Sequence, residues 1–275
     1  MKLKKTTVIT VGNHKGGSGK TSVTGGLGYA LAETGYQVLL VDGCGQMNLT
    51  RSYGFNKEQE KSLFPVIMNG APVEDCIQNG PHENLHFIIA DDSMASLDTD
   101  MFILDQREGV IERSFRKVIE SGTYDFVIFD TNPSLGLLNL NFMVASQEML
   151  IPVELSPFGI DGMDNLFKFF VRAQKVNPDI RILGAVFNKV DYREKITREA
   201  MEVVHHFFGD VVLKTSIPTD VKVKEAQWDR VPLGVFVEQS KGKKGKQRQS
   251  RAKKEFVELA QEVLEIVKER DYQKR

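Results

Sequence analysis

The segment VITVGNHKGGSGKTS, residues 8–22, passes from a β-branched run through closely spaced glycines to a lysine and two hydroxyl side chains. β-Branched residues favour a strand, and the residues after the glycines have helical spacing. A loop between such elements turns its N–H groups and the positive end of the helix dipole toward one point, where an anion binds. The segment therefore predicts a phosphate-binding loop within an α/β fold.

The side chains of this loop predict a nucleotide site. Its glycines let the backbone curl around phosphate oxygens, Lys20 is expected to reach the β- and γ-phosphates, and the Thr21 hydroxyl to ligate Mg²⁺. The predicted nucleotide-binding residues of the loop are Lys15, Gly16, Gly17, Ser18, Gly19, Lys20, Thr21 and Ser22. A glycine-rich turn without a ligand is the alternative, and the strand and helix context argues against it. His14 stands where the ordinary pattern has its first glycine, and we expect it to fill a structural position.

Size and composition fit one large domain spanning residues 1–275, with two small domains as the alternative. The formal net charge is -1, from 36 basic and 37 acidic residues, so any attraction to DNA or lipid requires a local patch. Two cysteines, Cys44 and Cys76, are too few for a disulfide framework and lack metal-ligand spacing. The first twelve residues carry too short an apolar stretch for a signal peptide or a membrane span. We therefore expect a cytoplasmic protein.

Short β-branched runs alternate with helical patterns along most of the chain, which predicts a doubly wound, mostly parallel sheet flanked by helices. We expect strands at 6–11, 37–42, 85–89, 124–130, 149–153 and 181–188, and helices at 20–34, 108–121, 160–176 and 195–208. Residues 54–82 contain several prolines and glycines and are expected to form a short helix framed by turns. Residues 239–254 are basic without any acid and are expected to form a loop, followed by a C-terminal helix at 254–270.

The chain resembles the ParA-type partition ATPases, the deviant Walker A group of the P-loop NTPases, along nearly its whole length. The family pattern KGGxGKT[TS] matches residues 15–22, VLLIDxDPQGNxT is similar to VLLVDGCGQMNLT at 38–50, and YDxIIIDxPPSLG is similar to YDFVIFDTNPSLG at 124–136. The resemblance implies a P-loop NTPase that hydrolyses ATP to ADP with Mg²⁺. It also implies an ATP-dependent sandwich homodimer, in which Lys15 reaches the nucleotide of the partner subunit.

The same resemblance assigns the acidic residues. It places Asp42 in the second coordination sphere of Mg²⁺ and makes Asp130 the Walker B acid, which holds a Mg²⁺-bound water, so that the metal set is Thr21, Asp42 and Asp130. The implied catalytic positions are Lys15, Lys20, Asp42 and Cys44. At position 44 the family carries an acid that orients the attacking water, and a thiol holds and polarises water poorly. We therefore expect Mg-ATP binding and dimerisation with slow hydrolysis.

Two later segments, AVFNKVDYR at 185–193 and SIPTDVKVKEAQ at 216–227, resemble the family segments around adenine. They imply contacts from Asn188, Pro218, Thr219 and Asp220.

The family also implies non-specific DNA binding by a nucleoid-associated protein and a centromere-binding, ParB-like partner. A basic patch neutralises DNA phosphates with little base readout, and dimerisation doubles it. The candidate DNA-binding residues are Arg193, Lys222, Lys241, Lys243, Lys244, Lys246, Arg248, Arg251, Lys253 and Lys254. A solvated lysine-rich loop without a ligand is the alternative interpretation.

Three other functions stay open. A MinD-like membrane-cycling ATPase shares Lys15, but residues 268–275, KERDYQKR, are too polar for a membrane-targeting tail. A metabolic enzyme such as a dethiobiotin synthetase or an iron-sulfur reductase is less consistent, because the reductase needs paired cysteines. A non-hydrolysing, ATP-gated regulatory scaffold remains compatible with Cys44.

Overall fold

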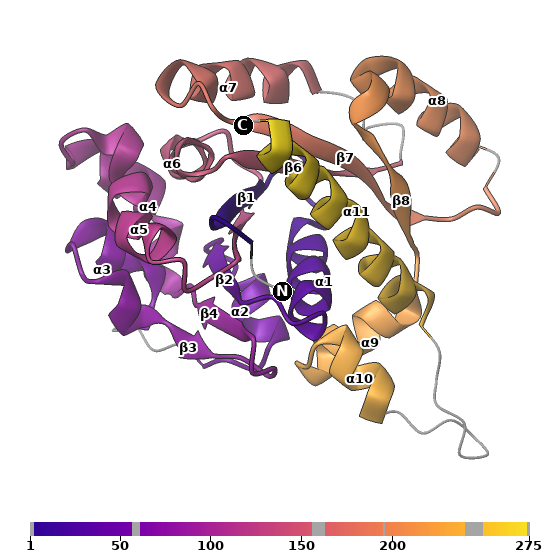
Figure 1. Cartoon of the computed structure of the whole chain (residues 1–275), viewed down its shortest axis with the longest axis horizontal. Helices are drawn as coiled ribbons and strands as arrows, with labels where there is room; N and C mark the ends of the chain where they lie inside the picture. Colours follow the sequence, from indigo (N-terminus) through magenta and orange to yellow (C-terminus); the bar gives the residue numbers. More distant parts are fainter. Residues whose placement is uncertain (1–2, 57–60, 156–162, 195, 240–249, 274–275) are drawn as a thin grey trace.

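A computed structural model describes residues 3–56, 61–155, 163–194, 196–239 and 250–273. Its strands form one eight-stranded sheet in the order β3-β4-β2-β5-β1-β6-β7-β8 (Figure 1). Every pairing is parallel except that between β3 and β4. The strands are β1 Thr7–Val11, β2 Val38–Gly43, β3 Gln78–Asn79, β4 Leu85–Ile88, β5 Phe126–Thr131, β6 Glu148–Glu154, β7 Arg181–Val190 and β8 Val212–Pro218.

Helices cover both faces of the sheet. The long helices α1 and α11 pack on one face, and α3 and α5 to α8 pack on the other (Figure 1). The helices are α1 Lys20–Glu33, α2 Asn48–Ser52, α3 Leu63–Met68, α4 Leu97–Asp100, α5 Val110–Glu120, α6 Leu137–Ala145, α7 Met163–Val176, α8 Ile196–Phe208, α9 Val221–Asp229, α10 Leu233–Gln239 and α11 Arg251–Gln273.

The central strands are apolar on both sides because each side meets a helical layer. In β1, Val8 belongs to the core under α5 and α6, whereas Ile9 and Val11 belong to the core under α1 and α11. All five residues of β1 and all six of β5 are buried. The two cores fix the sheet, so that the carboxyl ends of β1, β2 and β5 meet at one edge, where ligands of open α/β sheets bind.

The predicted α/β fold is confirmed. The expected strands correspond to β1, β2, β4, β5, β6 and β7, and the expected helices to α1, α5, α7 and α8. Residues 160–162 and 195 of two expected helices lie outside the described residues. Residues 54–82 contain the expected short helix, α3, and also the edge strand β3, which the sequence analysis missed.

The basic segment differs from its prediction at its C-terminal end. Residues 251–254 were expected in a loop, but α11 begins at Arg251 and continues to Gln273. The N–H groups of Ala252 and Lys253 are capped by Asp220 Oδ2 and Ser250 Oγ, so the helix starts about one turn earlier than the apolar pattern indicates. Residues 240–249 lie outside the described residues.

Candidate nucleotide-binding site

Two asparagine side chains hold the loop between β1 and α1. Asn13 Nδ2 donates a hydrogen bond to Pro152 O at 2.7 Å, and Asn13 Oδ1 accepts one from Lys15 N at 3.0 Å. Near the end of β7, Asn188 Nδ2 donates to Ser18 O at 2.8 Å. The carboxyl ends of β6 and β7 therefore fix both halves of the loop, which presents its backbone in one conformation.

The glycines of this loop meet two different requirements. Gly17 and Gly19 have φ of +79° and +85°, in the left-handed region that favours glycine. A Cβ atom on Gly19 would lie 1.9 Å from Asn188 Nδ2, whereas one on Gly16 or Gly17 would have no atom within 4 Å. The fold itself therefore requires glycine at position 19, whereas Gly16 and Gly17 have open space where a Cβ would stand, which leaves room beside the loop for phosphate oxygens.

The two lysines of the loop lie in different surroundings. Lys20 is buried, its Nζ donates to Lys15 O at 3.2 Å, and burial lowers its pKa while the nearby charge of Asp130 opposes the shift. Lys15 extends to the end of β6, where its Nζ lies 3.6 Å from Glu154 Oε2. Lys20 is therefore buried against its own loop, and its contact with a phosphate stays a prediction, while Lys15 lies beside Glu154 at the side of the loop.

Two buried carboxylates end adjacent strands beneath the loop. Asp42 of β2 and Asp130 of β5 are register partners, and each is at most 1% exposed. Asp42 Oδ2 accepts hydrogen bonds from Thr50 N at 2.9 Å and Thr50 Oγ1 at 2.8 Å, and its Oδ1 accepts one from Cys44 N at 3.0 Å. Asp42 thus has its acceptors filled and shapes the segment that follows β2.

Asp130 is less well satisfied. Its Oδ1 accepts a long hydrogen bond from Thr24 Oγ1 at 3.4 Å, and its buried Oδ2 has no partner of good hydrogen-bond geometry among the described residues. Burial, and then the charge of Asp42, raise the pKa of Asp130 to about 8. The Thr21 hydroxyl also interacts with this carboxyl and opposes the rise of its pKa. A buried acceptor without a partner costs about 1–3 kcal/mol, which a ligand or cation at this position would recover.

These oxygens fit Mg²⁺. The cation prefers hard oxygen ligands, keeps several waters, and is commonly held by one or two protein groups together with phosphates. The Thr21 hydroxyl opens α1 and lines the cleft described below, while Asp130 supplies the unpartnered carboxylate oxygen. A divalent cation would also offset the repulsion between Asp42 and Asp130.

Cys44 lies where the segment after β2 leaves the sheet. It is 5% exposed, and burial raises the pKa of its thiol to about 11. The side chain is therefore a neutral thiol near pH 7, a weak hydrogen-bond donor that carries no negative charge to polarise water. Cys44 nevertheless shares the lining of the cleft with Lys20.

The segment after β5 is held by its own polar network. Asn132 Oδ1 accepts hydrogen bonds from Ser134 N at 2.9 Å and Asn139 Nδ2 at 3.0 Å. Asp98 accepts from Ser134 Oγ at 3.1 Å and from Leu138 N at 2.8 Å. Asn132, which replaces a family proline, therefore braces this segment through side-chain hydrogen bonds.

A cleft of about 980 Å³ opens at this edge of the sheet, between the loop and α9. Among the predicted site residues, its lining contains Gly16, Gly17, Gly19, Lys20, Thr21, Ser22, Cys44, Asn188, Pro218, Thr219 and Asp220. The lining leaves out Lys15, Ser18, Asp42 and Asp130, of which Ser18, Asp42 and Asp130 are fully buried.

The predicted adenine contacts already have protein partners. Asn188 Nδ2 donates its hydrogen bond to Ser18 O, and Thr219 Oγ1 donates to Lys189 O at 2.9 Å. Asp220 Oδ1 caps α9 by accepting from Lys222 N at 2.9 Å. These side chains thus form the wall of the cleft, and their contact with a base stays a prediction.

Residues 6–182 match the family model described as an AAA domain. The chain is 33% identical to the sporulation initiation inhibitor protein Soj of Bacillus subtilis, over 86% of this chain and 93% of that protein. It is 30% identical to the chromosome partitioning protein ParA of Caulobacter vibrioides, over 97% and 96% of the two chains. The chain belongs to the ParA-type partition ATPases.

Solved structures support the fold of this ParA-type chain. Cobyrinic acid a,c-diamide synthase from Mycobacterium smegmatis, with a bound ATP analog and magnesium, superposes with a TM-score of 0.78 at 26% identity, covering 94% of each chain. The cell division ATPase MinD of Pyrococcus furiosus has a TM-score of 0.72 at 26% identity, covering 94% and 99%. None of the described helices has the length and apolar character that crossing a bilayer requires.

Three of the predicted DNA-binding residues of the ParA-type chain form ion pairs with acidic side chains. Arg193 is largely exposed but pairs with Asp191, and Lys222 pairs with Glu225. Lys253 lies between Glu33, at 3.2 Å, and Glu238, at 2.7 Å. Only Arg251 and Lys254 of the remaining set are described, and both are exposed; Lys241, Lys243, Lys244, Lys246 and Arg248 lie outside the described residues.

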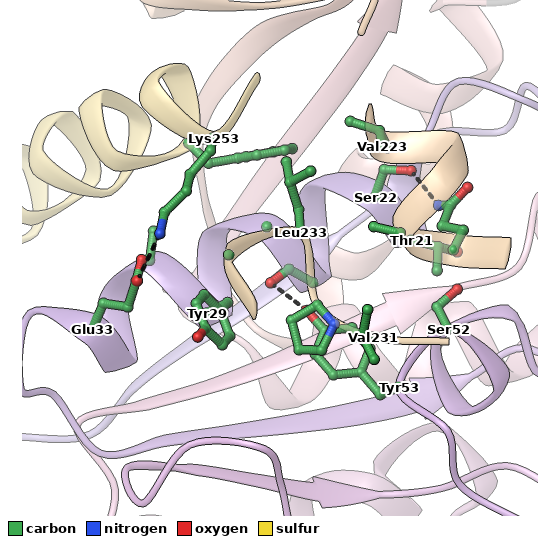
Figure 2. Close-up of a pocket in the computed structure, with 18 residues that line it drawn as sticks. Thr21, Ser22, Tyr29, Glu33, Ser52, Tyr53, Val223, Val231, Leu233 and Lys253 are labelled. Carbon is green, nitrogen blue, oxygen red and sulfur yellow. Dashed lines mark hydrogen bonds and ion pairs between the residues drawn. The ribbon is translucent and has the colours of Figure 1, made fainter. Parts of the chain in front are cut away.

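A second, small hollow of about 50 Å³ lies between α1, α10 and α11, on the side of α1 away from the sheet (Figure 2). Gln227 Nε2 of α9 donates to Ser22 Oγ at 3.1 Å at one end of it, and Tyr53 OH donates to Gly25 O at 2.8 Å at its base. The Gln227 bond ties α9 to the first turn of α1. The helix that borders the nucleotide cleft is thereby fastened to the phosphate loop.

Several residues of the site were missed from the sequence. Lys189 and Trp228 line the cleft, and Glu154 pairs with Lys15. Trp228 is 88% exposed, so no burial pattern marks it, and Glu154 simply ends an apolar strand. Lys189 follows the predicted Asn188 directly, and this adjacency was the one signal that could have indicated it.

Proposed function

We propose that this ParA-type ATPase binds Mg-ATP in the cleft, forms a sandwich homodimer and then holds DNA without sequence preference on the nucleoid of the cytoplasm. Hydrolysis to ADP, stimulated by a centromere-binding ParB-like partner, would release the DNA. The observation that carries the proposal is the pinned loop, which directs open backbone at Gly16 and Gly17 beside the buried Lys20. The relative from Caulobacter vibrioides is a chromosome partitioning protein, which agrees with this function.

Each described group has a defined task in this proposal. Lys20 would neutralise the β- and γ-phosphates, and the N–H groups of the loop would receive phosphate oxygens. Thr21 and Asp130 would hold Mg²⁺, directly and through a water, while Asp42 orients the segment that carries Cys44. The cation supplies charge neutralisation at the phosphates. Lys15 would reach across to the partner's nucleotide.

Nucleotide binding is tested by calorimetry with Mg-ATP. Wild-type protein is expected to bind, and Lys20→Ala to lose most of the affinity because one buried positive charge disappears. Size-exclusion chromatography with ADP, with ATP, and with ATP plus DNA then tests the cycle. A dimer that forms with ATP alone and captures DNA is the expected result; equal binding by Lys20→Ala contradicts the proposal.

Hydrolysis by this chain is proposed to be slow because Cys44 is buried and neutral. Cys44→Asp restores a carboxylate, and general-base or water-orienting groups contribute roughly 10²–10⁴-fold to rate. We expect the variant to turn over ATP at least about tenfold faster than wild type. Steady-state phosphate release measures the rate. Cys44→Asn is the control, because asparagine has the shape of aspartate but carries no charge. A fast wild type that is unaffected by the change would refute the idea.

The buried, neutral thiol of Cys44 also favours a second candidate function, a non-hydrolysing, ATP-gated scaffold. Single-turnover release of phosphate with the ParB-like partner present separates the two, because a scaffold shows none. A MinD-like membrane cycle is separated by co-sedimentation with anionic liposomes, where we expect the protein to stay in the supernatant with ATP.

DNA binding is assigned to the basic segment. Replacing Lys243, Lys244, Lys246 and Arg248 with alanine is expected to abolish ATP-dependent DNA retention and to leave nucleotide uptake intact, because none of the four belongs to the phosphate loop. Retention on nitrocellulose at fixed salt measures it. Retained DNA binding at the same salt counts against this assignment.

A further inference from the structure

Glu154, the last residue of β6, joins two lysines that come from different parts of the chain. Its Oε2 lies 3.6 Å from Lys15 Nζ, and its Oε1 lies 3.3 Å from Lys189 Nζ. Lys189 Nζ also donates a hydrogen bond to Gly17 O, on the loop itself. The three charged side chains therefore form one cluster at the side of the phosphate loop.

The two lysines are held unequally. The Lys15 side chain is 21% exposed and that of Lys189 is 47% exposed, with Glu154 at 28%. Lys189 has a second acceptor at Gly17 O and a left-handed backbone with φ of +57°, which is uncommon for a lysine. Of the two ion pairs of Glu154, the 3.6 Å pair with Lys15 is the longer, and Lys189 also contacts the loop at Gly17 O.

We propose that Glu154 is a positioning residue that holds the Lys15 ammonium beside its own loop, and that Lys189 keeps Glu154 paired when Lys15 moves away to the partner's nucleotide. The inference rests on the proposed function, in which Lys15 crosses the dimer interface. One ammonium cannot occupy both positions, so each dimer formed must break two Lys15–Glu154 pairs. Glu154 therefore raises the ATP concentration at which dimers form, and Lys189 lowers it by competing for the same carboxylate.

Charge counting explains the opposite effects. With Lys189 present, the carboxylate stays neutralised after Lys15 leaves, so the contribution of Glu154 is that of one partly exposed ion pair, about a two- to fivefold change in an equilibrium constant per subunit. With Lys189 removed, Glu154 faces Lys15 alone and attracts it more strongly. With Glu154 removed, neither lysine is restrained through the carboxylate.

The test compares Glu154→Gln, Lys189→Met and the double variant in the full chain. Analytical ultracentrifugation with Mg²⁺ measures the ATP concentration that gives half-maximal dimer. This concentration is divided by each variant's calorimetric Kd for Mg-ADP, so that the ratio excludes direct effects of the substitution on nucleotide binding in the cleft. We expect Glu154→Gln to lower this ratio about two- to fivefold, Lys189→Met to raise it by a similar factor, and the double variant to behave like Glu154→Gln.

Glu112→Gln is the matched control, because it removes a carboxylate paired with Arg116 on the exposed face of α5. It should leave the ratio as in wild type. A purely structural role of the cluster makes both single variants shift the ratio upward and makes their effects add, which would overturn the inference. A wild type that stays monomeric with saturating Mg-ATP overturns the proposed function itself, and a wild type that dimerises while Glu154→Gln leaves the ratio unchanged overturns this inference alone.

Discussion

Gly19 shows how tightly single residues are constrained around the phosphate loop. Its φ of +85° disfavours any side chain, and a Cβ would overlap the Asn188 amide that holds the loop. The glycines and their spacing indicated a loop from the sequence alone. The sequence could not indicate that Asn188 is the reason for one of them, because the two residues meet only after β7 is in place.

Gly19→Ala is expected to destabilise the fold by more than the left-handed backbone alone explains. An alanine in that region costs about 1–2 kcal/mol, and displacing Asn188 adds the loss of its hydrogen bond, about 1 kcal/mol. Gly35→Ala is the matched control, because Gly35 has φ of +92° and a Cβ added there would meet no atom within 4 Å. Thermal unfolding measures both, and equal losses would contradict the role of Asn188.

Asp130 makes stability depend on pH. Burial, and then the charge of Asp42, raise its pKa from the ordinary value of 3.8 to about 8. Between those values the folded protein keeps a proton that the unfolded chain has released, so the free energy of unfolding falls as pH rises through this window. Asp130→Asn has no such proton. Its stability advantage over wild type should therefore grow from about pH 5 to about pH 8.

Urea unfolding in EDTA, without nucleotide, measures this difference at each pH. Added Mg²⁺ should shrink it, because the cation favours the ionised carboxylate. A difference that stays constant across the window would contradict the raised pKa of Asp130.

At the scale of elements, strands with strong β-branched runs and helices with one apolar face were predicted, and the others were not. α6 is buried along all nine of its residues, so it shows no polar face and no helical period. β8 is an edge strand with only two buried residues, and α9 and α10 are short. Such elements owe their form to the layers that surround them, which a local pattern does not encode.

The C-terminal helix α11 is fastened to the sheet by an ion pair between Arg270 and Glu148 of β6. The two side chains are 23% and 8% exposed, and Arg270 Nη2 also donates to Ile182 O at 3.1 Å. Arg270→Ala removes this ion pair from a mostly buried carboxylate. We expect the free energy of unfolding to fall by about 2–3 kcal/mol. This is less than the cost of breaking a fully buried ion pair, because Arg270 is partly exposed.

Arg116→Ala is the control for that prediction. Arg116 pairs with Glu112 on α5, where both side chains are at least 40% exposed. Its replacement should lower the free energy of unfolding by about 0.5 kcal/mol or less. Chemical denaturation measures the free energy of unfolding of both variants, and the two values are compared where their m-values agree. Similar losses would show that the Arg270 pair does not fasten α11.

At the scale of the whole molecule, the loop motif was predictable because its ligands are consecutive in sequence, whereas the supporting cluster was not. Lys15, Glu154 and Lys189 come from three separate segments of the chain and meet only because β1, β6 and β7 are neighbours in the sheet. Strand order therefore determines the electrostatics of the site. The nucleotide and the cation were predicted from the family resemblance, whereas the groups that restrain the loop became visible only in the fold.

The charge of the whole molecule makes one last prediction about DNA. With a net charge of -1, the chain offers DNA no general attraction, so the proposed binding would depend on a local patch that the proposed dimer would present twice. Each phosphate contact contributes about -0.9 to the slope of log K against log salt concentration. The wild-type dimer with Mg-ATP should therefore show about twice the slope of Lys15→Ala, which is expected to stay monomeric. Fluorescence anisotropy with a random-sequence duplex, titrated at several salt concentrations, gives both slopes. Equal slopes would mean that a single subunit makes all the phosphate contacts, and that ATP controls DNA affinity by some means other than doubling the patch.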